Sequence, residues 1–391
     1  MSDGKKLVSS KLVKRLNKEE ILRQVIREGR ISRAEIAKRT QLSRPCVSTL
    51  VEEMIAEGLL QEVGVGDSTG GRKPVLLAYN YQAYAIAGAV YEGSRLDMAV
   101  ADLKGEFLAR RRAQLMPFDD GDRVLEVLAA ELEALLRESG MARKRVLGIG
   151  IGLPGVTRRQ NGTISDSPST GWMNRPIRQA MEERLGLPVL IDNDVNLMTL
   201  GEWVRGVGAG AANLVYIYVG TGIGAGVIVD GQFFRGSREA AGEIGHMLIG
   251  PVQSRRNGEF GVFEKHYSAP ALRRRAGEWL DLRQDGSIID ILQTHAEGGC
   301  ERSERLLEEV CRHWAYSLAN IISLLDPELL ILSGEMIHLQ SERVQQMEAW
   351  LREWVPAVPR IERARLGEQA GLIGAVHSVL EAFPYHTLLE D

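Results

Sequence analysis

Hydrophobic positions in residues 1–80 recur at helical spacing in three short segments and then alternate along two strands. The apolar side chains of residues 19–28 share one helical face. Ser32 opens a second helix with a capping-box pattern, and Ser43 opens a third with a long apolar stripe. The strands are expected at residues 59–65 and 74–79, joined by a glycine-rich tip. Three short helices followed by a hairpin predict a winged helix-turn-helix in residues 1–80.

From residue 81 onward, apolar runs of strand length alternate with longer segments of helical spacing. This alternation is typical of an α/β fold. No segment repeats at the period of about 20 to 50 residues that marks a solenoid. Strands are expected at residues 85–90, 96–102, 146–151, 189–191, 214–219, 225–229 and 329–332. Helices are expected at residues 123–139, 176–185, 303–325, 341–354 and 369–382.

The composition excludes several other classes of protein. The chain is 44% hydrophobic and 26% charged, which is ordinary for a globular protein and argues against disorder. Cys46, Cys300 and Cys311 show no paired spacing, so we expect reduced thiols in a cytoplasmic protein. The N-terminus lacks the apolar core of a signal peptide, and Asp326 and Pro327 interrupt the longest apolar run. We therefore expect no membrane span.

Charge is distributed unevenly along the chain. Residues 1–80 hold 15 Lys and Arg against 10 Asp and Glu, a net charge of +5. Residues 81–391 hold 33 against 42, a net charge of −9. A basic head on an acidic body indicates that only the head meets a polyanion.

The polar positions of the third predicted helix and of the hairpin tip are suited to contact DNA. The N-terminal end of such a helix enters the major groove, where arginine reaches guanine or phosphate and hydroxyls reach phosphates or base edges. Basic residues on a narrow wing suit a minor groove. The alternative is a small protein-interaction module with a solvated basic face. The predicted DNA contacts are Arg33, Ser43, Arg44, Pro45, Ser48, Thr49, Arg72 and Lys73.

Polar residues in the body gather in loops that follow predicted strands, where α/β proteins form crevices. Asn193 and Asp194 follow one strand and could bind a hydroxyl, although an Asx-rich turn explains them equally well. Residues 220–226 form a glycine-rich string that suits either a phosphate cradle or a hairpin. Glu243 and His246 are expected one helical turn apart on one face, where solvated polarity is the alternative. Glu264 is a further candidate.

Taken together, these motifs resemble the ROK family, in the branch with an N-terminal winged helix that the xylose and N-acetylglucosamine repressors typify. The matching stretches include STGGRKPVLLAYN, GIGLPGV, LPVLIDNDVN, GTGIGAG, GEIGH and LLDPELLILSG. The resemblance implies an actin-like, ribonuclease-H-like body of two lobes, with a sugar in the cleft. It assigns residues 81–192, with a C-terminal helix at about 369–391, to the first lobe and residues 193–368 to the second. The sugar-binding residues that it implies are Gly155, Asn193, Asp194, Glu243, His246 and Glu264.

Two departures from the family pattern shape the expected function. ROK kinases carry a DxGGT-type phosphate loop, and residues 88–100 hold no such motif, so we expect no kinase activity although Asp194 occupies the general-base position. The family also binds zinc through the histidine of ExGH and three cysteines. Here Arg255, Asn257 and Val262 stand at the cysteine positions, so we expect no zinc and no other cofactor. Arg255 and Arg256 could instead pair with an acidic group of the effector, although solvated loop charge is the simpler explanation.

We therefore expect a transcriptional regulator, most simply a repressor of carbohydrate uptake or catabolism genes. A homodimer, or a tetramer, would read an inverted repeat in double-stranded DNA. A sugar or sugar derivative in the cleft would change operator affinity, with release as the expected direction. The competing hypothesis is an ATP-dependent sugar kinase with a fused DNA-binding head. A regulator whose body docks a protein partner is a third possibility.

Overall fold

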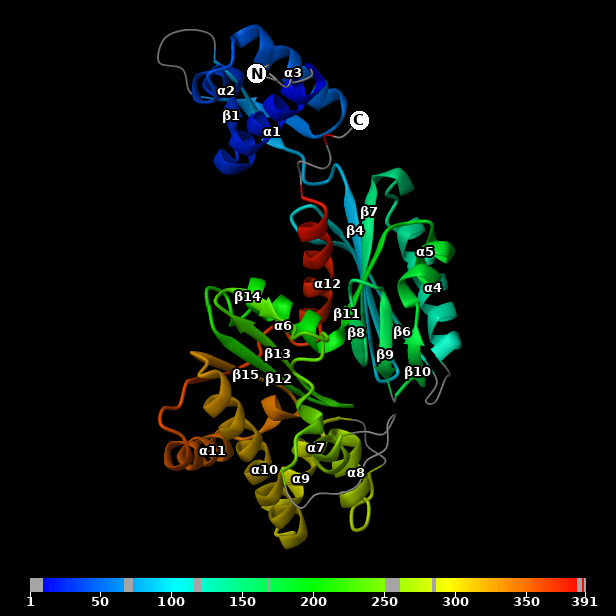
Figure 1. The fold of residues 1–391 in the computed structure, drawn as a ribbon, viewed down its shortest axis with the longest axis vertical. Coiled ribbons are helices and arrows are strands. Elements are labelled where there is room, and N and C mark those ends of the chain that lie inside the picture. Colours follow the sequence, from blue (N-terminus) through cyan, green and yellow to red (C-terminus); the bar gives the residue numbers. More distant parts are fainter. Residues whose placement is uncertain are drawn as a thin grey trace, which may run out of the picture.

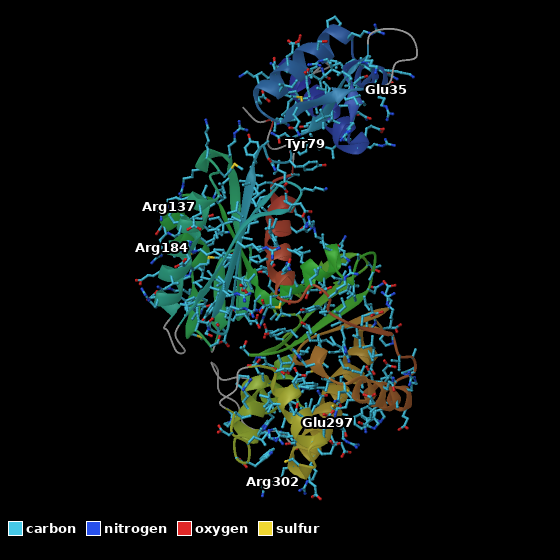
Figure 2. The ribbon with its side chains drawn as sticks, turned by 180° about the vertical axis from the view of Figure 1, so that it is seen from behind. Glu35, Tyr79, Arg137, Arg184, Glu297 and Arg302 are labelled. Carbon is cyan, nitrogen blue, oxygen red and sulfur yellow. The ribbon has the colours of Figure 1, made fainter. Side chains whose placement is uncertain are left out.

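The computed structural model describes residues 10–66, 73–115, 121–167, 169–249, 261–282, 286–384 and 389. Three parts follow one another along the long axis of the molecule: a small head, a first lobe and a second lobe (Figure 1). Each part has its own sheet and its own buried apolar cluster. Tyr79 lies at the junction of the head with the first lobe (Figure 2). None of the described helices combines the length and the apolar character needed to cross a bilayer.

The head has the predicted three helices and hairpin. Both helix caps predicted from the sequence are confirmed: Ser32 Oγ accepts from Glu35 N at 3.2 Å, and Ser43 Oγ accepts from Cys46 N at 3.4 Å. The first helix begins at Ser10 rather than at residue 19, because polar residues ahead of its apolar face lie along the third helix, where Lys18 pairs with Glu57 at 2.7 Å. The elements are α1 Ser10–Glu28, β1 Ile31–Ser32, α2 Arg33–Thr40, α3 Arg44–Ala56, β2 Leu60–Val65 and β3 Val75–Tyr79.

The first lobe is built on a five-stranded sheet of order β11-β7-β4-β5-β6. Strands β4, β7 and β11 run parallel, and β5 and β6 continue antiparallel from β4. Helices α4 and α5 cover one face, and the C-terminal helix α12 covers the other. The bounds are β4 Ala85–Glu92, β5 Arg95–Asp102, β6 Phe107–Gln114, α4 Gly121–Glu138, η1 Arg143–Arg145, β7 Val146–Leu153, α5 Ile177–Leu185, β11 Val189–Asn193 and α12 Gln369–Ala382. A smaller sheet beside them holds β8 Val156–Arg158, β9 Thr163–Ser167 and β10 Trp172–Arg175.

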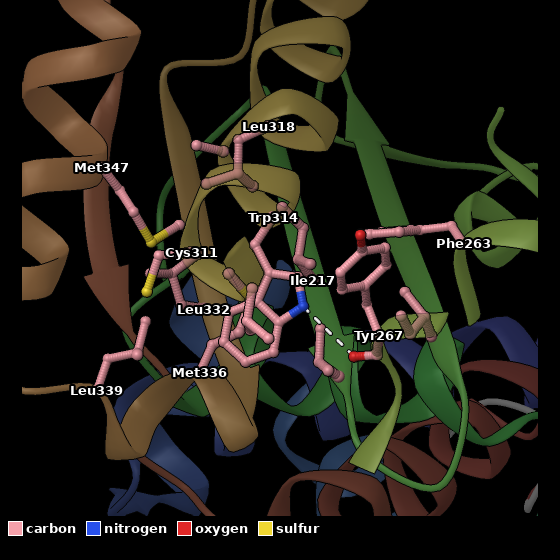
Figure 3. Close-up of a cluster of buried hydrophobic side chains, with 14 of the residues drawn as sticks. Ile217, Phe263, Tyr267, Cys311, Trp314, Leu318, Leu332, Met336, Leu339 and Met347 are labelled. Atoms are coloured by element: carbon pink, nitrogen blue, oxygen red, sulfur yellow. Dashed lines mark hydrogen bonds between the residues drawn. The ribbon is translucent and has the colours of Figure 1, made fainter. Parts of the chain in front are cut away.

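The second lobe repeats the five-stranded plan, with strand order β14-β13-β12-β15-β16. Trp314 lies fully buried at the centre of its largest apolar cluster, and its Nε1 donates to the carbonyl oxygen of Tyr267 at 3.4 Å (Figure 3). The strands are β12 Leu214–Val219, β13 Ile223–Val229, β14 Gln232–Phe234, β15 Leu329–Gly334 and β16 Arg360–Arg363. The helices are α6 Asp194–Arg205, η2 Ile244–His246, α7 Val262–Tyr267, α8 Ala269–Ala276, α9 Ile288–Glu297, α10 Glu301–Leu325, η3 Glu335–His338 and α11 Ser341–Trp354.

Helices α6 and α12 pack against each other between the two large sheets. Gly201 and Gly374 allow this approach, because a Cβ at either position would clash with the backbone of the facing helix. Glu202 of α6 is fully buried, and its carboxylate accepts from the backbone N–H groups of Val207, Arg365 and Leu366 at 2.6 to 2.9 Å. These bonds satisfy a buried charge and fix the loop that precedes α12.

Several elements of the body differ from the sequence prediction. Strand β6 and helix α6 were not predicted, and Glu243 and His246 lie at the two ends of a single 3-10 turn rather than on an α-helical face. The glycine-rich string of residues 220–226 forms the turn and the beginning of an antiparallel hairpin, which is the second of its two predicted alternatives. In that hairpin Gly224 and Gly226 leave room for α6, since a Cβ at Gly226 would clash with Thr199.

Candidate sugar site and DNA-binding surface

A cavity of about 160 Å³ lies between the two lobes, where the carboxyl ends of parallel strands β7 and β11 meet the hairpin of β12 and β13. Residues from both lobes line it. The cavity brings together all six residues predicted for the sugar site: Gly155, Asn193, Asp194, Glu243, His246 and Glu264.

Asn193 and Gly155 are joined by a hydrogen bond at the edge of the first-lobe sheet. Asn193 Nδ2 donates to the carbonyl oxygen of Gly155 at 3.1 Å, while Asn193 Oδ1 accepts from Asn196 N at 3.1 Å and caps α6. Gly155 has a φ of +102°, and a Cβ there would clash with Asp166 and Ser167. Asn193 therefore has the capping role of an Asx turn and also faces the cavity.

Asp194 is the first residue of α6 and is buried. Its Oδ1 accepts from Val195 N at 2.9 Å. Burial raises the pKa of Asp194 to about 7, and the neighbouring carboxylates of Glu92 and Glu243 add to the shift. Glu92 in turn accepts from the hydroxyl of Tyr218 and pairs with Arg95 at 2.8 Å. A carboxyl group with such a pKa exchanges a proton near neutrality and can accept hydrogen bonds from sugar hydroxyls when ionised.

The second lobe contributes Glu243, His246 and Glu264 from two short helical segments. Glu264 Oε2 accepts from Ile223 N at 2.8 Å, which fastens α7 to the start of β13. Gly222 and Gly245 provide space for this carboxylate, because a Cβ at either one would lie 3.0 Å from Glu264 Oε2. Glu243 precedes η2, and His246 ends it with an exposed side chain.

The cavity also contains two carboxylates that the sequence analysis missed, Asp166 and Glu239. Asp166 Oδ1 is buried, and it has no hydrogen-bond partner among the residues that the structure describes. Asp166 belongs to β9, whose small sheet was not predicted, so no expected strand end pointed to it. Together with Asp194, Glu243 and Glu264, these residues give the described lining a strongly acidic character.

The residues of helix α3 that are predicted to contact DNA lie off the buried apolar face of the helix. Val47, Leu50, Val51 and Met54 are buried, as predicted. The outward positions at the N-terminal end of α3 are Ser43, Arg44, Pro45 and Thr49, which are exposed, and Ser48, which is half-buried. Elsewhere on the head, Arg33 pairs with Glu62 of β2 at 3.0 Å and Lys73 is exposed, while Arg72 lies outside the described residues.

Comparison with known protein families finds a match for the head and a match for the two-lobed body. The pattern of the ROK family matches residues 90–382, and that of a winged helix-turn-helix DNA-binding domain matches residues 15–61. The chain belongs to the ROK family. Within this ROK protein, α3 takes the place of the recognition helix of a winged helix-turn-helix.

Regulators and kinases both occur among the relatives of this ROK protein. The xylose repressor of Caldicellulosiruptor bescii is 29% identical over 94% of this chain and 96% of its own. The crystal structure of a ROK family transcriptional regulator, described as a homolog of the Escherichia coli MLC protein, has a TM-score of 0.73 at 26% identity and covers 96% of this chain and 98% of its own. The ROK hexokinase of Thermus thermophilus has a TM-score of 0.62 at 30% identity, over 76% of this chain and 99% of its own.

A second cavity, of about 530 Å³, shares Tyr218 and Thr221 with the first. Residues 88–100 belong to the β4–β5 hairpin, which forms one side of it. Arg95 of that hairpin pairs with Asp97 at 2.8 Å and also contacts Glu92 and Glu368. Ion pairs between Arg95 and three carboxylates thus occupy this wall of the cavity.

At the positions that the family resemblance gives to three zinc-binding cysteines, this chain carries Arg255, Asn257 and Val262. Arg255 and Asn257 lie outside the described residues, and Val262 is the first residue of α7, with an aliphatic side chain that offers no metal ligand. In the described part of the chain, no three His, Cys, Asp or Glu side chains are grouped to hold a metal ion. His246 keeps its place at the cavity without the three cysteines of the family pattern.

Proposed function

We propose that this ROK protein is a sugar-responsive transcriptional repressor. The observation that carries the proposal is that one chain contains a winged helix-turn-helix and a cavity lined by all six sugar-site residues of the family pattern. The head would bind operator DNA, and a sugar between the lobes would shift the protein toward a conformation with lower operator affinity. A ligand causes such a shift only if it binds one conformation better than the other.

We further propose that the effector is a neutral sugar. Asp166, Asp194, Glu239, Glu243 and Glu264 all line the cavity. Each ionised carboxylate would repel a phosphate or a uronate at short range in a partly desolvated site. The N-terminal amides of α6 that face the cavity already have acceptors, since Val195 N and Asn196 N donate to Asp194 and Asn193.

The protein would act on DNA as a homodimer, because two heads are needed to read an inverted repeat. Helices α10 and α11 support this proposal with exposed apolar side chains, among them Leu324, Tyr316 and Trp354. The rings of Tyr316 and Trp354 are tilted by 34° to each other, with centroids 5.0 Å apart. Light scattering of the wild type and of Leu324→Glu, which places a charge on this surface, tests it. A monomeric wild type would contradict the dimer.

Fluorescence anisotropy tests the repressor function. DNA from upstream of the gene is labelled and titrated with the protein at a fixed salt concentration, since phosphate contacts make affinity salt-dependent. The titration is repeated with D-xylose, D-glucose, N-acetyl-D-glucosamine and N-acetyl-D-glucosamine 6-phosphate. We expect tight binding that one neutral sugar weakens. Binding that only the phosphate ester weakens would contradict the neutral effector, and failure to bind any promoter fragment would contradict the repressor.

One observation favours the second candidate, an ATP-dependent sugar kinase. Asp194 is buried at the cavity with a pKa of about 7, which suits a general base. We favour a protein without kinase activity, because residues 88–100 lack the phosphate motif and place Glu92 close to Asp194. A coupled assay of ADP formation with the same sugars separates the two hypotheses. Turnover that Asp194→Ala abolishes would establish the kinase.

We also propose that the protein carries no structural zinc, since only His246 remains of the four ligands in the family pattern. Elemental analysis of the purified protein tests this, and a stoichiometric zinc content would contradict it.

A further inference from the structure

The C-terminal end of the recognition helix α3 is held by a side chain from the body. Arg145, in the 3-10 turn before β7, donates from Nη1 to the carbonyl oxygen of Glu57 at 3.0 Å. The same nitrogen lies 3.4 Å from the carbonyl oxygen of Ala83, and the guanidinium lies over the ring of Tyr84, 5.1 Å from its centroid. One side chain therefore contacts the end of α3 and the last two residues, Ala83 and Tyr84, of the linker that leads into β4.

Glu57 is the C-cap residue of α3, and its carbonyl oxygen accepts a hydrogen bond from outside the helix. The last turn of the helix is closed by Gly58 N, which donates to Ile55 O at 2.9 Å, and by Leu59 N, which donates to Met54 O at 2.8 Å. The carbonyl of Glu57 lies beyond these bonds and carries part of the negative end of the helix dipole, where an arginine is favourable. Arg145 supplies that positive charge from another part of the molecule.

The position of Arg145 in the chain links this contact to the cavity. Strand β7 follows directly after Arg145, and the turn at its other end, Pro154 and Gly155, lines the cavity. Eight strand residues span about 26 Å. Strand β7 is hydrogen-bonded to β4 on one side and β11 on the other, so it moves as part of a sheet rather than as a flexible tether. Strand β4 runs parallel to it from the linker to Tyr91, a second lining residue (Figure 1).

We propose that Arg145 fixes the recognition helix to the central strands of the first lobe and so makes operator affinity depend on what occupies the cavity. This inference rests on the proposed function and adds the residue through which the two sites communicate. A displacement of the β7 end at Gly155 reaches Arg145 through the sheet, and Arg145 passes it to the C-terminal end of α3. Because α3 is a rigid rod, its N-terminal end at Arg44 then changes its angle to the DNA groove.

The test compares Arg145→Ala with Arg143→Ala in the full-length protein. Arg143 lies in the same 3-10 turn, but it pairs with Glu133 of α4 at 2.8 Å, so both partners of this ion pair belong to the first lobe. Hydrogen exchange without sugar reports whether the amides of Gly58 and Leu59 lose protection. Operator affinity is measured with and without the sugars named above. The ratio of the two affinities is the coupling between the sites, which is typically about 5- to 150-fold in allosteric proteins. Arg145→Lys keeps the charge but loses the planar guanidinium that lies over the ring of Tyr84.

We expect Arg145→Ala to raise exchange at both amides, to keep the wild-type sugar affinity and to reduce the coupling below about threefold. Arg143→Ala should behave as the wild type and Arg145→Lys should lie between the two. Unchanged exchange in Arg145→Ala, or a folded Arg145→Ala with wild-type coupling, would overturn the proposal. A wild type whose operator affinity no sugar alters would contradict the proposed function instead, and the exchange measurement would still decide whether Arg145 holds the helix.

Discussion

Arg235 of the second lobe and Asp192 of the first are joined by two hydrogen bonds beside the cavity. Nη1 lies 2.9 Å from Oδ1, and Nη2 lies 2.7 Å from Oδ2. Asp192 is only 3% exposed, and its backbone adjoins Asn193, while Arg235 opens the loop that carries Glu239 and Glu243. The pair thus joins the acidic loop of the second lobe to the end of strand β11 in the first lobe.

Loss of Arg235 should destabilise the protein, because Arg235→Ala removes the bidentate cation from the buried Asp192. The carboxylate would keep its hydrogen bonds from Asn193 N and Asn196 Nδ2 and the more distant Arg159, at 3.6 Å. Removal of one partner of a buried pair costs about 3 kcal/mol of unfolding free energy. Urea denaturation measures the change. The control is Arg238→Ala, which removes an exposed arginine from the same loop. Equal stability of the two variants would contradict a structural role for the pair.

The pKa of Asp194 predicts a pH dependence of sugar binding. Burial raises this pKa to about 7, so the group is protonated below that pH and ionised above it. The ionised carboxylate accepts stronger hydrogen bonds from hydroxyls, and sugar affinity should therefore rise as the pH increases through about 7. Calorimetric titration at pH 6 and pH 8 measures the difference, which Asp194→Asn should remove. If Asp194→Asn shows the same pH dependence of sugar affinity as the wild type, another group is responsible for it.

The same shift has a consequence for stability. A raised pKa means that the folded state holds its proton more tightly than the unfolded chain does between pH 4 and pH 7. The contribution of Asp194 to the free energy of unfolding is fully present below the unfolded pKa and is lost as the pH rises through about 7. Denaturation of the wild type and Asp194→Asn at several pH values should show a difference that grows in that window and levels off above it.

The acidic lining predicts discrimination against charged effectors. N-acetyl-D-glucosamine 6-phosphate should bind at least about tenfold more weakly than its parent sugar, since one unit charge at about 6 Å costs more than 1.4 kcal/mol at an effective dielectric constant of 20. Asp166→Asn removes one carboxylate and should reduce the difference in affinity between the neutral sugar and its phosphate ester. Competition between the phosphate ester and a neutral sugar measures their relative affinities. Tighter binding of the phosphate ester would show that cationic side chains reach the cavity.

Arg44 should contribute directly to operator affinity, because it is exposed at the N-terminal end of α3. If the guanidinium reads a base, Arg44→Ala should lose about 1 to 3 kcal/mol of binding free energy for the operator. If it contacts a phosphate, the variant's operator affinity should depend less steeply on salt concentration. The control is Arg137→Ala, on α4 of the first lobe and distant from the head (Figure 2). Anisotropy at several salt concentrations distinguishes the two roles, and wild-type binding by Arg44→Ala would exclude both.

The sequence predicts the elements of this fold best where local chemistry decides them. Ser32 and Ser43 cap their helices as expected, and the bounds of the helices at residues 341–354 and 369–382 agree with the structure. Helix α6 could not be predicted in this way. Its N-cap, Asn193, and its first residue, Asp194, also suit a turn. Most of its residues are buried, so it lacks the polar face that reveals a surface helix.

The six sugar-site residues were predicted from spacing and family resemblance, and the fold brings them to one cavity. Asp166 and Glu239 were missed because no local signal marks them: one lies in an unpredicted strand and the other in a loop. Arg145 was missed for a related reason. Its partners Glu57 and Ala83 are distant in sequence, and only the packing of head on body makes it a cap.

The most direct test of the account is a complete thermodynamic cycle for the wild type with its operator and its effector sugar. Operator dissociation constants are measured with and without saturating sugar, and sugar dissociation constants with and without saturating operator. Linkage requires both ratios to be the same. The account predicts that each ligand weakens the binding of the other by the same factor, within the range of about 5- to 150-fold. A sugar that binds in the cavity while the operator dissociation constant stays unchanged would contradict it.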